Sequence, residues 1–338
     1  MTETSPQHHP GLIGAQPEPD PQAVRSKVVR QEEGFPTFWL IAPASLWLIL
    51  FLVVPLASII IFSFWASTPQ GMEPDFSLSN YGEYFAVEGF FDPEADRFLQ
   101  PSIFVRTLWN TVYYTLLVML ICLIVGYPVA LVIATAEQKW KPWLLLIIIL
   151  PFWTNLLIRT YALLNILGTR GRVNEFLGWI WDGADGLTGG MLGAFEPIKF
   201  LGTDLGVIIG LVYVALPFAV LPIYSALERL DRSYLEASLD LGAGQFRTFF
   251  KVLLPLTAAG VTTAAIITFI PMLGSFLTPD LLGRGQVDMI ANVIERQFKK
   301  ANDWPFGSAL SLFLLYVTFI ILAVRSMIDM HRSKGRRH

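Results

Sequence analysis

Six long apolar blocks constrain the fold of this chain more than any other feature of its 338 residues. A helix needs about 20 apolar residues to cross the roughly 30 Å hydrocarbon core of a bilayer. Because lipid cannot satisfy backbone N–H and C=O groups, each block is expected to be helical. The sequence therefore predicts an all-α integral membrane protein with six transmembrane helices. The blocks are 39–64, 108–133, 143–167, 205–226, 256–277 and 306–328.

Composition agrees with this class. Hydrophobic residues make up 54% of the chain and charged residues 15%, whereas about a quarter of a soluble domain is charged. The first block is too long for the core of a signal peptide and lacks a small-residue cleavage site, so we expect a retained span. The single cysteine, Cys122, lies inside the second block, which excludes an intramolecular disulfide.

Basic residues predict the orientation of these spans. Cytoplasmic loops carry an excess of Lys and Arg, and the rule is strongest close to span ends. Lys139 and Lys141 lie in the short 134–142 loop, and further basic residues lie in the 227–255 loop and the C-terminal tail. Placing both termini in the cytoplasm puts the larger share of the 24 Lys and Arg residues there. We therefore predict an N-in/C-in topology.

Three regions follow from this reading. Residues 1–37, rich in Pro, Gly, Gln and charge, are predicted to be a disordered cytoplasmic tail. Residues 38–329 form the transmembrane domain, and residues 330–338 form a basic cytoplasmic tail.

The cytoplasmic loop over 227–255 contains its own turn signals. The Ser233 to Glu236 spacing predicts a capping box, in which Glu236 accepts the Ser233 amide. Gly242 suits the residue of positive φ that ends a helix. A second helix is expected from Gln245 to about residue 254, with Pro255 in the first turn of the next span. The loop should therefore form a helix–turn–helix on the cytoplasmic surface, either as a docking element or as a plain amphipathic connector.

The same loop resembles the EAA loop of type I ABC-importer permeases. Ser238 takes the place of the usual second alanine of that pattern. Three further stretches, 151–161, 274–283 and 303–307, resemble the spermidine/putrescine (polyamine) branch of this family. The similarity covers about residues 38–328. The residues that match the loop pattern are Glu236, Ala237, Gly242, Val252, Leu254 and Pro255.

This resemblance implies a transmembrane permease domain over 38–329 and a multi-pass location in the bacterial inner membrane. It implies a second permease subunit, two cytoplasmic ATPase subunits and an extracytoplasmic binding protein as partners, with lipid around them and no nucleic acid. It also implies which residues contact the ATPase. These are Tyr234, Leu235, Glu236, Ala237, Ser238, Asp240, Leu241 and Gly242.

Motifs for chemistry are missing from the sequence. It contains no G-x-x-x-x-G-K-[ST] phosphate loop and no zincin spacing, and its four histidines lie in the terminal tails. We therefore expect no catalytic residue, no metal site and no cofactor on this chain, with ATP and Mg²⁺ bound by the partner ATPase. On its own the chain is not expected to be an enzyme.

Polar and aromatic residues within the spans are candidates for the substrate path. Arg159 stands out because a charge in hydrocarbon is costly and usually faces water or a partner. Snorkelling toward the interface, or a salt bridge between helices, is the alternative for this residue. Aromatic rings can hold an ammonium group by cation–π attraction. The candidates are Trp153, Asn155, Arg159, Tyr161, Tyr213 and Ser275.

Other features have structural interpretations. Gly206 and Gly210 form a GxxxG face that predicts close helix packing. The Gly- and Asp-rich stretch over 181–193 is expected to be a mobile outer loop. Asp303 is expected to cap the last helix, with Pro305 in its first turn.

Competing functions stay open at this stage. The same machine could import iron(III), thiamine, an opine or sulfate, and some relatives carry an acidic residue where Ser275 stands. An ion-coupled secondary transporter is less favoured, because the two halves show no clear repeat and no Asp or Glu lies in the middle of a span. A non-transport membrane scaffold is disfavoured by the 227–255 loop.

Overall fold

A computed structural model of the chain describes residues 37–68, 71–85, 103–189, 191, 193–231 and 233–334. All but the last residue of the tail predicted over 1–37 lies outside the described residues, as do positions 335–338 of the basic tail. The chain divides into two compact units, Met1–Ser58 and Ile59–His338.

The first apolar block is helical, as predicted. Helix α2 (Thr37–Leu48) continues through the π-helical turn η1 (Ile49–Val53) into α3 (Val54–Phe62). The 22 residues of Ile41–Phe62 are long and apolar enough to cross a membrane.

A short hairpin follows the end of α3 in the second unit. Strands β1 (Ala66–Thr68) and β2 (Gly71–Glu73) pair antiparallel, with Ser67 opposite Met72. Helix α4 (Ser79–Phe85) follows. The buried Asn80 side chain donates to the carbonyl oxygens of Ser63 and Trp65 at 3.0 and 2.8 Å. This amide ties α4 to the end of the preceding span.

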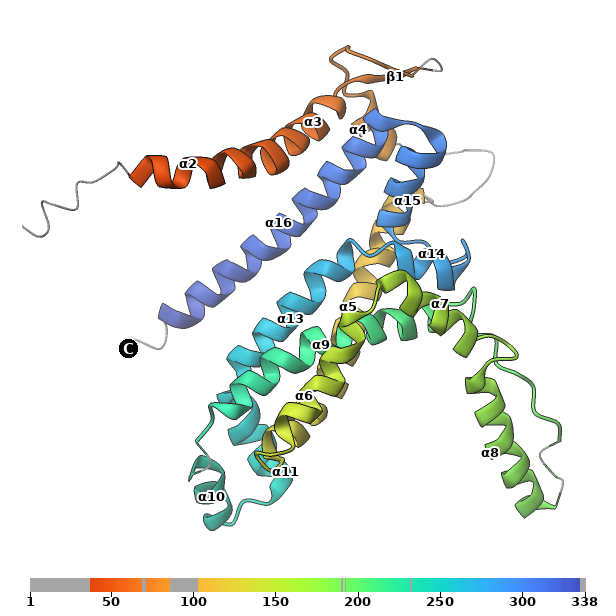
Figure 1. Ribbon diagram of the computed structural model, residues 1–338, viewed down its shortest axis with the longest axis vertical. Helices are drawn as coiled ribbons and strands as arrows, with labels where there is room; N and C mark the ends of the chain where they lie inside the picture. The colour runs from red at the N-terminus through yellow and green to blue at the C-terminus, as the bar shows by residue number, and fades with distance from the viewer. Residues whose placement is uncertain are drawn as a thin grey trace, which may run out of the picture. The chain divides into compact units, whose positions relative to one another are not determined.

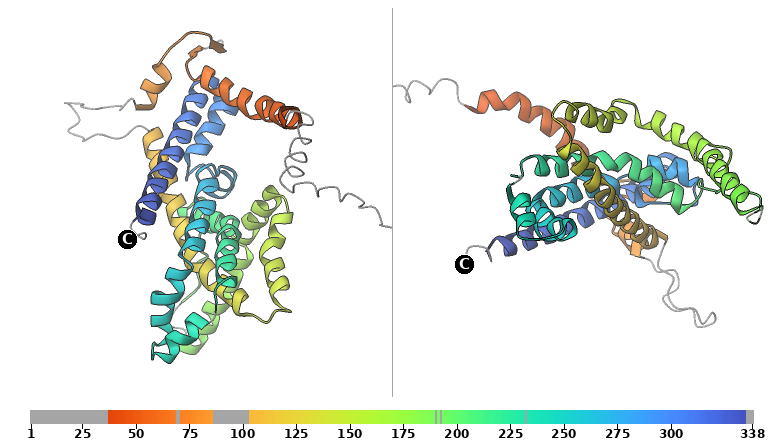
Figure 2. Two further views of the ribbon diagram at one scale, coloured as in Figure 1. Left: turned by 90° about the vertical axis from the view of Figure 1, so that its left-hand side faces the viewer. Right: turned by 90° about the horizontal axis from the view of Figure 1, so that it is seen from below.

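Three helices form the core of the second unit. Helices α5 (Ile103–Thr135), α9 (Asp204–Glu228) and α13 (Ala258–Leu273) lie side by side (Figure 1, Figure 2). Val118, Leu211 and Ala215 are fully buried between them. Small residues allow this close approach: a Cβ on Gly126 would stand 3.4 Å from the Ala219 methyl.

The third apolar block, predicted as a membrane-spanning helix over 143–167, is broken into two helices. Helix α6 (Lys141–Ile149) runs into a 3₁₀ turn, η2 (Leu150–Trp153), and α7 (Leu156–Ile166) leaves at 98°. Pro151 lacks an N–H for the helical ladder, and Thr154 and Asn155 are extended. The Asn155 side chain accepts the Leu157 amide at 2.8 Å and restarts the helix.

The fifth apolar block also contains a bend. Helix α10 (Ser233–Asp240) is followed by α11 (Gln245–Thr248), the π turn η3 (Phe249–Leu253) and α12 (Leu254–Leu256). The run Gln245–Leu256 meets α13 at 68°. Among the described residues, four helices are long and apolar enough to cross a membrane, or up to six if each bent pair counts as one span.

The stretch expected to be a mobile loop over 181–193 is mostly helical, which corrects that prediction. Helix α8 (Arg172–Thr188) includes Trp181 and ends at Gly189, whose φ is +73°. The helix begins upstream of this stretch, where Val173 and Leu177 pack against the core, and at its far end the Trp181 indole N–H donates to the Gly193 carbonyl at 2.9 Å. These contacts outweigh the weak helix propensity of the glycines.

The C-terminal part contains α14 (Leu277–Gly283), α15 (Ile290–Arg296), η4 (Gln297–Ala301) and α16 (Trp304–Lys334). Asp303 Oδ1 accepts the Phe306 amide at 3.0 Å, which confirms the predicted cap. A Cβ on Gly210 would stand 2.7 Å from Thr278 and 2.8 Å from Leu282. Gly210 therefore serves helix packing between α9 and α14, as predicted.

Candidate functional site

The start of helix α10 differs from the predicted capping box. The Ser233 N–H donates to Asp231 Oδ1 at 3.0 Å, and Ser233 is the first residue of the helix. Asp231, not Glu236, therefore accepts this amide. Hydrogen bonds from the Ser233 N–H and hydroxyl lower the pKa of Asp231. An ionised side chain at this position also interacts favourably with the helix dipole.

The end of α10 is as predicted. Gly242 has a φ of +79°. Its N–H donates to the Leu239 carbonyl at 2.8 Å, and the Ala243 N–H donates to the Ser238 carbonyl at 3.1 Å. These two bonds define a Schellman motif. The helix therefore ends in a turn of fixed geometry, and Gly242 is its C′ residue.

A second contact holds the two arms of the loop together. Gly244 begins the second arm, and the hydroxyls of Ser238 and Thr248 lie 3.0 Å apart. Phe249 packs edge-on against Tyr127 of α5, with ring centroids 5.2 Å apart. Pro255 lies in the last turn before the 68° bend, and the next helix begins at Ala258. The predicted place of Pro255 in the first turn of the next span is thus wrong.

The tip of the loop is exposed and apolar. Leu241 is 89% exposed and Phe246 is 81% exposed. Tyr234, Glu236 and Ala237 are exposed on the same short helix. Leu235 and Ser238 are half-buried and pack within the loop region. Large exposed apolar side chains outside a lipid-facing span mark a surface that a partner covers.

The eight residues predicted to contact a partner differ in their exposure to solvent. Leu235 and Ser238 position the helix, whereas the other six lie on its exposed side: Tyr234, Glu236, Ala237, Asp240, Leu241 and Gly242. Phe246 extends this surface, although sequence reasoning missed it. The sequence did carry a signal for Phe246: a large apolar residue in the first turn of a helix, directly after the turn that contains Gly242 and Gly244.

Arg159 is the main polar feature of the bent helix pair α6–α7. Its Nε and Nη1 atoms are buried, and neither has a hydrogen-bond partner among the described residues. The guanidinium lies 5.1 Å from the centre of the Phe152 ring, and Phe152 packs edge-on against Phe218 of α9. No ion pair to Arg159 occurs within the described part of the chain, so an internal salt bridge does not explain it.

The other path candidates come from separate elements. Trp153, Asn155 and Tyr161 flank the break in the third span and are exposed. Tyr213 lies on α9, and Ser275 is half-buried in the turn after α13. Between described residues, no hydrogen bond or ring contact joins Tyr213 or Ser275 to the break. The side chain of Asn155 serves as the cap of α7, and a substrate role for the six residues stays a prediction.

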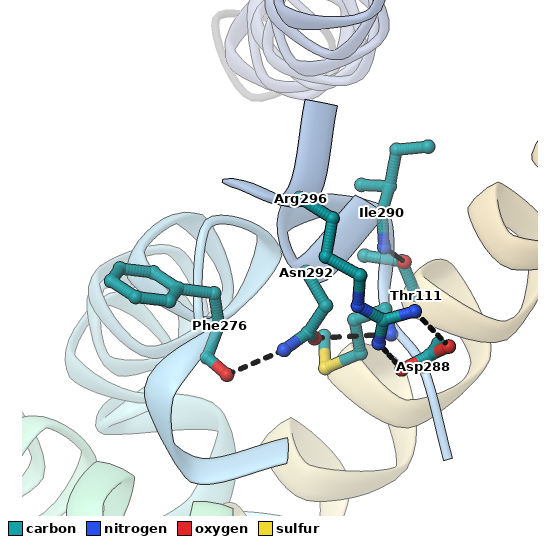
Figure 3. Close-up of polar contacts among 7 residues, drawn as sticks. Thr111, Phe276, Asp288, Ile290, Asn292 and Arg296 are labelled. Atoms are coloured by element: carbon teal, nitrogen blue, oxygen red, sulfur yellow. Dashed lines mark hydrogen bonds and ion pairs between the residues drawn. The ribbon is translucent and has the colours of Figure 1, made fainter. Parts of the chain in front are cut away.

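A partly buried polar cluster between α5 and the α14–α15 segment was not anticipated (Figure 3). Thr111 Oγ1 accepts the Ile290 amide at 2.7 Å. Asn292 donates to the Phe276 carbonyl at 2.7 Å, and Arg296 forms a two-point ion pair with Asp288. The Thr111–Ile290 bond ties this segment to α5, whereas the other two contacts hold the parts of the segment together. Sequence patterns could not find the cluster, because Thr111 and Ile290 are 179 residues apart.

Thr111→Val should destabilise the protein, whereas Thr263→Val should not. Both hydroxyls donate to the carbonyl four residues earlier, but only the buried Thr111 also accepts a backbone amide. An unsatisfied buried N–H costs about 1–3 kcal/mol. Thermal unfolding of the purified protein in detergent measures this difference. Equal midpoints for the two variants would show that the Thr111 bond contributes nothing.

Comparisons with known proteins agree with this arrangement. The family model "binding-protein-dependent transport system inner membrane component" matches residues 33–333. The spermidine/putrescine transport system permease protein PotB of Escherichia coli K12 is 39% identical over 280 residues, covering 82% of this chain and 92% of that protein. PotB of Haemophilus influenzae is 36% identical over 279 residues, covering 82% and 88%.

A solved structure shares the fold. The crystal structure of a bacterial ABC transporter involved in the import of the acidic polysaccharide alginate matches with a TM-score of 0.66 at 18% identity. The match covers 91% of this chain and 98% of that one. Together with the family match, these findings place the protein among multi-pass proteins of the bacterial inner membrane. The chain belongs to the family of binding-protein-dependent transport system inner membrane components.

Proposed function

We propose that this chain is one membrane subunit of an ATP-driven importer of polyamines such as spermidine and putrescine. The observation that carries the proposal is the exposed loop tip around Leu241 and Phe246, set by Asp231 at one end of α10 and Gly242 at the other. The identity of 36–39% to PotB proteins supports the choice of cargo.

The loop would act as a rigid contact for an ATPase. Because both ends of α10 are capped and Ser238 bonds to Thr248, the helix can transmit a displacement without unwinding. ATP and Mg²⁺ would bind to the ATPase subunits, and this chain would contribute no catalytic residue. Each bent helix pair would count as one span, which gives six transmembrane spans with both termini in the cytoplasm.

The remaining partners complete the importer. A second permease subunit would face this chain across the path, two ATPase subunits would bind the two loops, and an extracytoplasmic binding protein would deliver substrate. Arg159 is a poor direct ligand for a polyamine cation, because like charges repel. Its place beside the break in the third span is better suited to a partner contact or a gate than to substrate binding.

Uptake measurements test the proposal. The assembled complex in liposomes, with ATP inside and its binding protein outside, is expected to take up radiolabelled spermidine or putrescine. Excess sulfate, thiamine or iron(III) should not compete if the cargo is a polyamine. Competition by one of those solutes would support an ATP-driven importer but contradict polyamines as its substrate. Uptake that persists without ATP but requires an ion gradient would contradict an ABC importer.

A further inference from the structure

The one buried residue of helix α6 is charged. All nine residues of this helix are described, and Lys141 is the one that is buried, at 8% exposure. Among the apolar residues that follow, Trp143 and Ile147 are exposed. Lysine is almost never fully buried unless it is paired. The first turn of α6 is therefore held by Lys141, while Leu144, Leu145 and Ile148 further along the helix pack partly buried against the core.

The partner of Lys141 is Glu228, the last residue of α9. Lys141 Nζ lies 2.9 and 2.8 Å from the two carboxylate oxygens. The two side chains are 10% and 35% exposed, whereas those of the nearby Lys139–Glu137 pair are both 70% exposed. Exposed pairs contribute little, but a partly buried pair that meets at two oxygens restrains the orientation of both helices.

The surroundings of this pair connect it to the candidate coupling loop. The pair borders a shallow cavity of about 200 Å³. Leu235 of α10 and Leu253 of η3 line the same cavity, as do Leu131 of α5 and Leu230 just after α9. The pair therefore lies where the loop, α5, α6 and α9 converge.

Each partner of the pair leads to a different part of the proposed machine. Glu228 is separated by a short turn from Asp231, the residue that caps α10. Lys141 begins α6, which leads directly to the break at Pro151–Asn155 and to Arg159 beyond it. A displacement of α10 can thus reach the broken span through two short helical segments and one ion pair.

We propose that the Lys141–Glu228 ion pair is the mechanical link that passes movement of α10 to the broken third span. This inference rests on the proposed function, because it requires an ATPase bound to the loop. Both residues are positioning residues: they contact neither ATP nor solute. Without the link, ATP hydrolysis continues but no longer drives the span that contains Arg159.

The test compares ATP hydrolysis with uptake in the whole complex in liposomes. In the single variants Lys141→Glu and Glu228→Lys, stimulated ATPase activity should stay near the wild-type rate while uptake falls about tenfold or more, within the range of ordinary coupling effects. The charge-swapped double variant Lys141→Glu/Glu228→Lys should recover most of the uptake. Lys139→Glu, which breaks the exposed pair, serves as the matched control and should behave as wild type.

A second double variant separates linkage from simple stability. Lys141→Met/Glu228→Gln keeps the side-chain volumes without the ion pair, so it should assemble and hydrolyse ATP but stay uncoupled. Full uptake by this variant, or an unchanged ratio of solute to ATP in both single variants, would overturn the link. Absence of ATP-dependent uptake by the wild-type complex would instead refute the proposed function, so the two failures are distinguishable.

Discussion

Gly242→Val is expected to abolish ATP-driven uptake while leaving the chain in the membrane. Gly242 has a φ of +79°, and a Cβ at this position would meet no atom within 4 Å. The effect is therefore backbone strain and not a clash. A left-handed conformation costs an ordinary L-residue about 1–2 kcal/mol, and a β-branched residue is worse still. Relief of that strain unwinds the Schellman turn and moves Leu241 out of its place on the tip.

Gly244→Val is the matched control for this prediction. Gly244 is two residues away and equally open, but its backbone is extended, with φ −68° and ψ 159°. Valine adopts that conformation readily. Uptake and co-purification of the ATPase should therefore survive in Gly244→Val and be lost in Gly242→Val. Equal uptake by both variants would mean that the shape of the turn does not matter for coupling.

Glu236→Lys tests the same surface without backbone strain. Glu236 is exposed on α10, so reversing its charge leaves the fold intact and alters only what a partner meets. We expect the variant to insert normally and to lose the ATPase or its coupling to uptake. Normal uptake by both Glu236→Lys and Gly242→Val would contradict the role assigned to the loop.

Arg159→Leu is expected to lower uptake or complex yield by about tenfold or more without unfolding the chain. Two of its guanidinium nitrogens are buried and unpartnered among the described residues, and each unsatisfied buried donor costs about 1–3 kcal/mol. Leucine removes that cost, so the variant should not lower the thermal stability of the chain. A charge kept at such a cost within a span is expected to serve function.

Arg172→Leu is the control for Arg159→Leu. Arg172 is an exposed arginine at the start of α8, and its pair with Glu175 is open to solvent. Its replacement should leave uptake unchanged. Loss of complex yield in Arg159→Leu would place the partner of Arg159 on a neighbouring subunit, whereas normal yield with reduced uptake would place Arg159 at the path. Unchanged yield and uptake would show that Arg159 only extends its charge toward the membrane–water interface and has no role in transport or assembly.

Local signals in the sequence were sufficient for much of this protein. The apolar blocks predicted the helices, because the length of a span is set by the bilayer and not by the rest of the chain. Gly242 and Asp303 were identified correctly, because a positive φ and a helix cap depend on only a few neighbouring residues. The capping box failed for a related reason: Asp231, two residues earlier, competes for the same amide.

Only the tertiary structure revealed the Lys141–Glu228 pair, the Thr111–Ile290 bond and the two buried nitrogens of the Arg159 guanidinium. The first two join residues 87 and 179 positions apart. Periodicity and motif spacing in a single sequence do not predict contacts over such separations. The break in the third span had Pro151 as a local signal, but its 98° bend depends on the cap that Asn155 provides. Hydrophobicity thus determined which segments are long and apolar enough to cross a membrane, and contacts between distant helices decided which polar residues meet.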